Sequence, residues 1–231
     1  MKNNYFYWCK KYETKTINLP LLFFHVPKCA GTTLSVILSW LINPQSRVPG
    51  PLFFNNDKGG ETAYEKFNKI DNYQTYNKIK FLYGHFPFEI LEYLQKPFFK
   101  ITVLRDPIDR CFSHYNWILN RKYSSADIDL QTLFKTNKIT KNTITNQFSG
   151  IGVSKQNTDI ALNLAYKNLT TKIDKIYKSE NLLQALKDLI SMFDLPDVLF
   201  QNHQESLYEN KINKNKCTAI IRENNVLDIE L

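Results

Sequence analysis

The segment FFHVPKCAGTTL, residues 23–34, constrains the fold more than any other part of the chain. Its first residues are bulky and apolar apart from one histidine, as the residues of a buried strand are. Pro27 cannot donate a hydrogen bond to a sheet, so the strand is expected to end there. From Leu34 to Leu41, apolar side chains recur at helical spacing. The segment therefore predicts a buried strand, a tight loop and a helix.

The residues of this loop are suited to binding phosphate. Ala30 and Gly31 have little or no side chain, so the backbone is expected to approach a ligand closely. Thr32 and Thr33 place hydroxyl groups at the start of the helix, where unpaired N–H groups and the helix dipole attract anions. Lys28 adds a full positive charge. These features predict a phosphate-binding loop.

The loop differs from the Walker A pattern G-x-x-x-x-G-K-[ST] in the position of its charge. When the two are aligned on Gly31, Val26 stands in place of the first glycine and Thr32 in place of the lysine. The lysine of this chain comes earlier, at Lys28. The architecture is therefore expected to be P-loop-like, with the cation in a different place.

The remaining chain alternates between strand and helix patterns. Strands are predicted at 79–83, 98–104 and 173–177, and helices at 61–70, 108–121, 130–134, 140–148, 159–169 and 181–192. Loops are predicted at 43–60 and 201–216, and a final strand or helix at 217–231. This order predicts an α/β, P-loop-like three-layer fold with a central, mostly parallel sheet flanked by helices. We expect a single domain over residues 1–231, with residues 1–18 as an N-terminal arm.

Polar residues follow three of the predicted strands. They are the loop from Lys28 to Thr33, the pair Gly84-His85, and Arg105. Ligands of parallel α/β sheets bind at the carboxyl ends of the strands, so these groups converge if the strands are neighbours. Asp106 and Pro107 suit the cap and first turn of the following helix.

Two of these segments resemble sulfotransferase signatures. The pattern P-K-x-x-G-T-[TS] resembles the 5′-phosphosulfate loop of enzymes that use 3′-phosphoadenosine-5′-phosphosulfate (PAPS). Its form HVPKCAGTTL is most similar to the carbohydrate sulfotransferases, the group that contains the heparan sulfate 2-O- and 6-O-enzymes. The segment VLRDPIDRCFSHY, residues 103–115, resembles the second signature, in which an arginine and a serine bind the 3′-phosphate. Arg105 and Ser113 match both positions.

The resemblance implies a function and a set of site residues. The chain is expected to move a sulfuryl group from PAPS to a hydroxyl of a carbohydrate or glycan, leaving 3′-phosphoadenosine-5′-phosphate (PAP). His85, in FLYGHFPF, resembles the catalytic histidine of these enzymes and is the expected general base. Lys28 is expected to stabilise the leaving phosphate, and no metal is expected. The implied donor-binding residues are Lys28, Cys29, Ala30, Gly31, Thr32, Thr33, Arg105 and Ser113.

Weaker resemblances lie further along the chain, each with a structural alternative. They are Asn142-x-x-Thr145-Asn146-Gln147 near the nucleotide, the strand-to-helix step at 178–182, and the closing D-x-x-L of residues 228–231. One departure lies in the loop itself. Cys29-Ala30 replaces the more usual Thr-Gly or Thr-Ala, which removes a hydroxyl that would face a phosphate.

The composition limits which molecules the protein is expected to bind and in which cellular compartment it is expected to lie. Lys and Arg number 30 against 22 acidic residues, a net charge of +8 that suits an acidic glycan acceptor. Nucleic acid is not expected as a partner. The four cysteines have no C-x-x-C spacing and are expected to be free thiols in a reducing compartment. The sequence shows neither a signal peptide nor an apolar run of membrane-spanning length, which predicts a cytoplasmic protein.

Two other functions compete with sulfuryl transfer. A P-loop kinase or NTPase requires a Walker lysine and an acidic magnesium site, but Thr32 occupies the lysine position and Asp106 better fits a helix cap. A non-catalytic protein that binds acidic glycans agrees with the positive charge. It leaves the two signature segments unexplained.

Overall fold

The central sheet has four parallel strands in the order β3-β2-β4-β5. The computed structural model describes residues 6–8, 18–42, 79–94, 96–120, 129–154, 156–196, 199–201 and 214–231. The strands are β2 (Leu21–Phe24), β3 (Phe81–Gly84), β4 (Phe99–Leu104) and β5 (Lys175–Lys178). In β2, Leu21 is aligned with Phe81 on one side and with Phe99 on the other. The predicted parallel sheet is confirmed.

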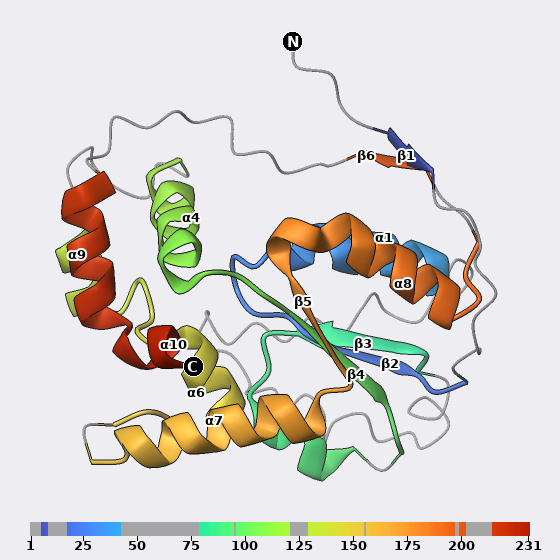
Figure 1. The fold of residues 1–231 in the computed structure, drawn as a ribbon, viewed down its shortest axis with the longest axis horizontal. Helices are drawn as coiled ribbons and strands as arrows, with labels where there is room; N and C mark the ends of the chain where they lie inside the picture. The colour runs from blue at the N-terminus through green and yellow to red at the C-terminus, as the bar shows by residue number, and fades with distance from the viewer. Residues whose placement is uncertain are drawn as a thin grey trace.

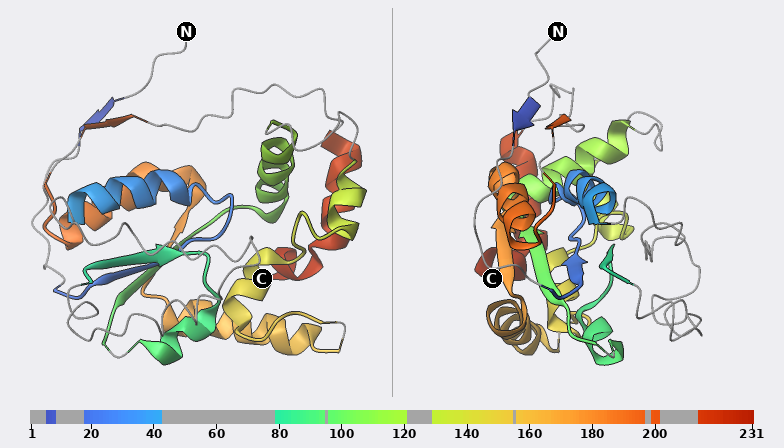
Figure 2. Two further views of the ribbon diagram at one scale, coloured as in Figure 1. Left: turned by 180° about the vertical axis from the view of Figure 1, so that it is seen from behind. Right: turned by 90° about the vertical axis from the view of Figure 1, so that its right-hand side faces the viewer.

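Helices cover both faces of this sheet (Figure 1). Helices α1 (Gly31–Ile42) and α8 (Leu182–Met192) lie on one face. Helix α7 (Thr158–Lys172) and the short 3-10 helix η2 (Phe88–Tyr93) lie on the other, as both views in Figure 2 also show. All four residues of β2 are fully buried between the layers, which explains why this strand is continuously apolar. The expected α/β class with flanking helices is confirmed.

A second group of helices stands beyond the carboxyl ends of the strands (Figures 1 and 2). It includes α4 (Pro107–Asn120), α5 (Leu130–Lys135) and α9 (Lys214–Asn224). These helices share a separate apolar cluster made of Cys111, Ile118, Leu130, Leu133, Phe134, Ile139, Cys217 and Ile221. The cluster supports α4, the helix that follows β4, from its side away from the sheet.

Two shorter helices connect the end of the chain to the strand ends. They are α6 (Thr143–Ser149) and α10 (Val226–Glu230). The buried carboxylate of Asp228 accepts hydrogen bonds from the backbone N–H groups of Ile144 at 3.0 Å and Thr145 at 2.8 Å, and from the Thr145 hydroxyl at 2.8 Å. Gln147 Nε2 donates to the carbonyl of Phe86 at 3.2 Å. The weaker sequence resemblances at Asn142–Gln147 and Asp228 therefore have structural roles, since Asp228 caps α6 from another helix.

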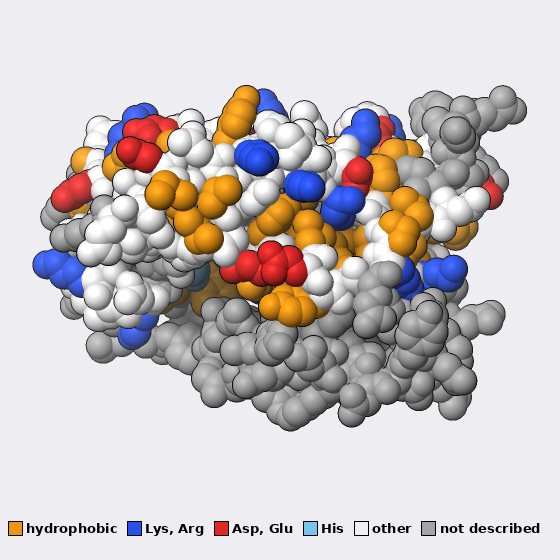
Figure 3. Space-filling view, turned by 90° about the horizontal axis from the view of Figure 1, so that it is seen from below, with side chains coloured by type: hydrophobic (Ala, Val, Ile, Leu, Met, Phe, Trp, Pro, Cys, Tyr) orange, Lys and Arg blue, Asp and Glu red, His pale blue; other side chains and the backbone are white. Residues whose placement is uncertain are grey.

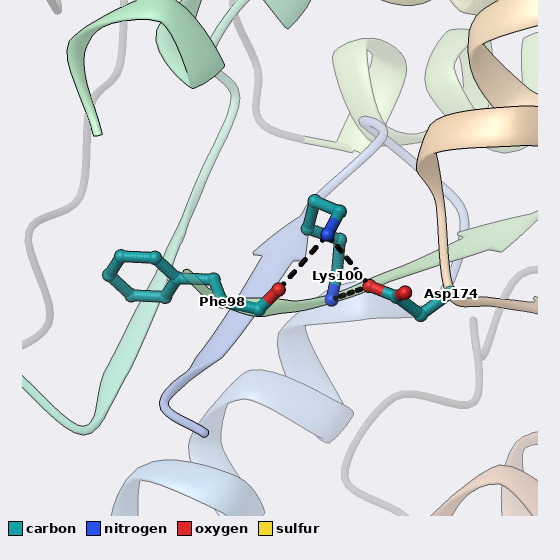
Figure 4. A network of polar contacts seen from close by, with 3 residues as sticks. All are labelled: Phe98, Lys100 and Asp174. Carbon is teal, nitrogen blue, oxygen red and sulfur yellow. Dashed lines mark hydrogen bonds and ion pairs between the residues drawn. The ribbon is translucent and has the colours of Figure 1, made fainter. Parts of the chain in front are cut away.

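The amino ends of β4 and β5 are joined by a polar network (Figure 4). Asp174 Oδ2 accepts from the backbone N–H of Lys100 at 2.7 Å and forms an ion pair with its ammonium at 2.9 Å. The same ammonium donates to the carbonyl of Phe98 at 3.0 Å. This network fixes the register of the edge strand at the end of the sheet opposite the polar loops.

Several element boundaries differ from the predicted ones. Strands β3 and β5 begin two residues later than predicted, and the final segment consists of the helices α9 and α10. Helix α9 begins at Lys214, inside a stretch predicted to be loop because its sequence is polar. The predicted step at 178–182 is present as the 3-10 helix η3 (Ser179–Asn181), which leads into α8. The loop at 43–60 and the helix at 61–70 lie outside the described residues.

The described part of the expected N-terminal arm is a strand. Strand β1 (Phe6–Trp8) pairs in antiparallel orientation with β6 (Leu199–Gln201), and Figure 1 shows this pair beyond α1 and α8. None of the helices that the structure describes is long and apolar enough to span a lipid bilayer.

Candidate active site at the carboxyl ends of three strands

The strand order brings the predicted polar segments together. Strand β2 lies between β3 and β4, so the loop after β2 is flanked by His85 on one side and Arg105 on the other. The backbone N–H of His25 donates to the carbonyl of Gly84 at 3.0 Å, and the Thr102 hydroxyl donates to the carbonyl of Phe24 at 2.8 Å. These bonds hold the three strand ends in fixed positions. The predicted convergence at neighbouring strand ends is confirmed.

The loop between β2 and α1 has an unusual backbone. Lys28 and Ala30 have φ angles of 69° and 58°, in the left-handed region that non-glycine residues seldom adopt. Between them, the Cys29 N–H donates to the carbonyl of Val26 at 3.3 Å. The Cys29 thiol is fully buried, and burial raises its pKa to about 12. This side chain therefore faces the protein interior and adds no polar group to the surface of the loop.

Residue 31 must be a glycine because the His25 side chain occupies the space that a Cβ atom would need. A Cβ atom built on Gly31 would lie 2.9 Å from Cγ of His25 and would collide with Cδ2 and Nε2 of the same ring. The ring cannot easily retreat, because it also stacks on Phe23 with a centroid separation of 5.4 Å. The sequence suggested that this glycine permits close approach to a ligand. The structure gives a different physical reason, since the His25 imidazole occupies the space of a side chain.

The two histidines of the site are in direct contact. His85 Nδ1 lies 2.6 Å from the backbone carbonyl oxygen of His25, and the two ring centroids are 4.4 Å apart. Burial, and then the charges of His85 and Lys28, lower the pKa of His25 to about 3. His25 is therefore neutral at physiological pH.

The ammonium of Lys28 extends toward α4. Its Nζ lies 5.5 Å from the centroid of the Trp117 ring, a cation–π arrangement. Sequence reasoning did not identify Trp117 as a site residue. One signal was present, because Trp117 follows Ser113 by four residues and so lies on the same side of α4.

Arg105 and Ser113 are both half-buried, at the end of β4 and on α4. Within the described residues, the Arg105 guanidinium forms no hydrogen bond or ion pair, so its donors are available to an anion. Asp106 Oδ1 accepts from the backbone N–H groups of Ile108 at 2.9 Å and Asp109 at 3.0 Å. Helix α4 begins at Pro107, so the predicted cap and first turn are confirmed.

A buried arginine lies beneath this surface and was also missed by sequence reasoning. Arg110 is fully buried, and its Nη2 lies 3.1 Å from Cys111 Sγ. Its Nε and Nη1 have no hydrogen-bond partner in the described part of the chain. The nearby Asp228 has a raised pKa, chiefly because of burial, while the charge of Arg110 acts in the opposite direction. Arg110 on α4 thus acts electrostatically on Asp228 of α10.

The described residues include no group of three or more histidine, cysteine or acidic side chains that could hold a metal ion. Cys29, Cys111 and Cys217 are free thiols, as predicted for them, whereas Cys9 lies outside the described residues.

A comparison with protein families agrees with this geometry. The family described as "Sulfotransferase family" matches residues 18–229. The match covers most of the chain and includes all three strand ends, so this protein belongs to the sulfotransferase family and is an enzyme of sulfuryl transfer. A search of curated proteins found no match. The family assignment favours sulfuryl transfer over the kinase and the non-catalytic alternatives.

Proposed function

We propose that this protein transfers a sulfuryl group from PAPS to a hydroxyl group of a carbohydrate or glycan acceptor. The observation that carries the proposal is the convergence of the β2 loop, His85 and Arg105 at three adjacent strand ends. The cationic loop and the separate arginine suit the two phosphate groups of a sulfuryl donor, and the base suits the hydroxyl of an acceptor.

The residues present fit such a donor. The loop from Lys28 to Thr33 and the N-terminus of the twelve-residue helix α1 supply a cation and backbone N–H groups for the 5′-phosphosulfate. Arg105 and the Ser113 hydroxyl supply donors for the 3′-phosphate. The buried Cys29 is included through its backbone position alone.

The contact between the histidines assigns the proton on His85. A carbonyl oxygen only accepts hydrogen bonds, so His85 Nδ1 carries the proton that is directed at the His25 carbonyl. In the neutral ring, Nε2 is then the unprotonated, basic nitrogen. His25 does not compete as a base, because its lowered pKa reflects a buried environment that resists protonation. His85 is therefore the base in our proposal.

The proposed reaction is a single in-line displacement. His85 Nε2 accepts the proton of the acceptor hydroxyl while the oxygen of that hydroxyl forms a bond to sulfur. The bond between sulfur and the bridging oxygen of the 5′-phosphate breaks, and that oxygen keeps the electron pair. Lys28 and the N–H groups at the start of α1 stabilise the charge that develops there, as preorganised donors do.

The acceptor is proposed to be acidic because the chain carries a net charge of +8. Figure 3 shows the molecule from below, where the lysine and arginine side chains of the described residues are scattered among hydrophobic, polar and acidic ones. The described residues form no continuous basic patch on this face. We place the acceptor near the strand ends, because its hydroxyl must reach His85 in the proposed reaction.

Transfer of radioactive sulfate from [³⁵S]PAPS to a panel of neutral and uronic acid polysaccharides tests this function. His85→Gln is expected to lower kcat by about 10²–10⁴, the usual contribution of a general base, while PAP binding is retained. Lys28→Met is expected to lower kcat as well. Lys100→Met is the matched control, since it removes a lysine from the opposite end of the sheet. Undiminished turnover by His85→Gln would contradict the assigned base.

A further inference from the structure

Trp117 lies where the two proposed phosphate sites meet. It is one helical turn beyond Ser113 on α4, and its ring lies 5.5 Å from Nζ of Lys28, which comes from the loop after β2. The contact therefore joins the two segments that bind opposite ends of the donor in the proposed function.

Several features fix the position of the indole. Its centroid is 5.9 Å from that of His114, and burial, followed by the charges of Arg110 and Lys28, lowers the His114 pKa to about 4. This neighbouring ring is therefore neutral and does not repel the ammonium. Helix α4 is packed against α5 and α9 through the second apolar cluster. Trp117 itself remains 38% exposed, so part of its ring is open to solvent.

The chemistry of the contact suits a cation that must bind phosphate. A lysine side chain has large rotamer entropy, and its ammonium has three donors on a flexible stem. An aromatic face attracts this ammonium without a negative charge that would neutralise it. A carboxylate at the same place would compete with phosphate for the ammonium, whereas an uncharged indole does not. The left-handed backbone of Lys28, with φ 69°, fixes the direction in which its side chain leaves the loop.

We propose that Trp117 is a positioning residue, which holds the Lys28 ammonium in place for the 5′-phosphate of the nucleotide. The inference rests on the proposed function, because it assigns the 5′-phosphate to Lys28. In this proposal, Trp117 of α4 belongs to the part of the site that binds the 5′-phosphate, the group that leaves in the reaction.

A double-mutant cycle tests this role by calorimetry. PAP and adenosine 3′-phosphate, which lacks the 5′-phosphate, are titrated into the wild type, Trp117→Leu, Lys28→Met and the double variant. Trp117→Leu is expected to weaken PAP binding about 2–5-fold, the size of a partly exposed cation–π contact. It is expected to leave adenosine 3′-phosphate binding unchanged and to have no further effect on PAP in the Lys28→Met background. Trp117→Phe, which retains an aromatic face, is expected to recover most of the affinity.

The results separate the inference from the proposed function. If Trp117→Leu weakened both nucleotides equally, or weakened PAP equally with and without Lys28, the indole would contact the nucleoside itself and the inference would be wrong. Unchanged PAP affinity in Trp117→Leu would also overturn it. If the folded wild type bound neither nucleotide, the proposed function would fail together with the inference. Thermal melting of each variant verifies that it is folded.

Discussion

The contact between Gly31 and His25 gives a sharp prediction for the substitution Gly31→Ala. The added methyl carbon would lie 2.9 Å from Cγ of the imidazole and closer to two other ring atoms. Attractive contact between carbon atoms requires about 3.5–4.0 Å, and because Cδ2 and Nε2 lie closer than Cγ, the ring would have to move by more than about 1 Å. Phe23 stacks on this ring with its centroid 5.4 Å away, the tilted His85 ring lies against it at 4.4 Å, and both oppose this movement.

The expected effect follows from overpacking. Insertion of a methylene-sized group into a packed interior costs about 1–3 kcal/mol, so Gly31→Ala should lower the free energy of unfolding by that amount. A displaced His25 ring also presses on the His85 ring, whose centroid is 4.4 Å away. The affinity for PAP and the turnover number should therefore fall together with stability.

Urea denaturation of Gly31→Ala, His25→Ala and the double variant measures this effect. His25→Ala removes the ring and leaves space for the new methyl group, so the double variant should be more stable than the sum of the two single changes by about 1–3 kcal/mol. Strict additivity would refute the account, because the glycine would then be needed for something other than the ring. Wild-type stability in Gly31→Ala would refute it too.

Other predictions concern stability and pH. Because the pKa of His25 is about 3 in the folded state and 6.5 for the unperturbed group, the unfolded chain binds a proton that the folded chain does not. Stability is thus lost as pH falls from 6.5 toward 3, by about 1.4 kcal/mol per pH unit for this group. In His25→Gln, the free energy of unfolding measured by urea denaturation should therefore depend less steeply on pH over this range, by the same amount per unit. Asp228→Ala leaves two backbone N–H groups of α6 without their acceptor and should cost about 1–3 kcal/mol for each, whereas Asp228→Asn, which keeps a carbonyl oxygen, should cost less in the same assay. Equal losses in the two Asp228 variants would contradict this assignment.

Much of the fold was predictable because apolar runs and turn residues mark its main elements. The strand before Pro27 and the helix after Asp106 follow directly from local rules. The edge strand β5 was harder to delimit, because three of its four residues are exposed and its sequence has no continuous apolar run. Polar residues at the start of α9 likewise concealed a helix whose buried side chains come later.

The site was predictable in outline and less so in its contacts. Lys28, His85 and Arg105 were predicted because ligands of parallel α/β sheets bind at the carboxyl ends of the strands, and because of the two signature segments. The strand order brings the segments that carry them together. The partners of these residues depend on side chains that meet only in the folded chain. The His85 bond to a backbone carbonyl, the Trp117 ring beside Lys28 and the buried Arg110 all belong to this class. Only the four-residue spacing of Trp117 from Ser113 gave a local signal, and the contacts themselves are not encoded by any local pattern.

Nucleotide binding by the wild type and by Arg105→Ala tests the central claim most directly. Isothermal titration with PAP, and separately with ATP and magnesium, should show tight, metal-independent binding of PAP alone. Arg105→Ala should lose at least tenfold in PAP affinity, because a charge-assisted bond to phosphate is removed. Lys100→Ala, at the opposite end of the same strand, should bind normally. Preference for ATP with magnesium, or full PAP affinity in Arg105→Ala, would contradict a PAPS site at these strand ends.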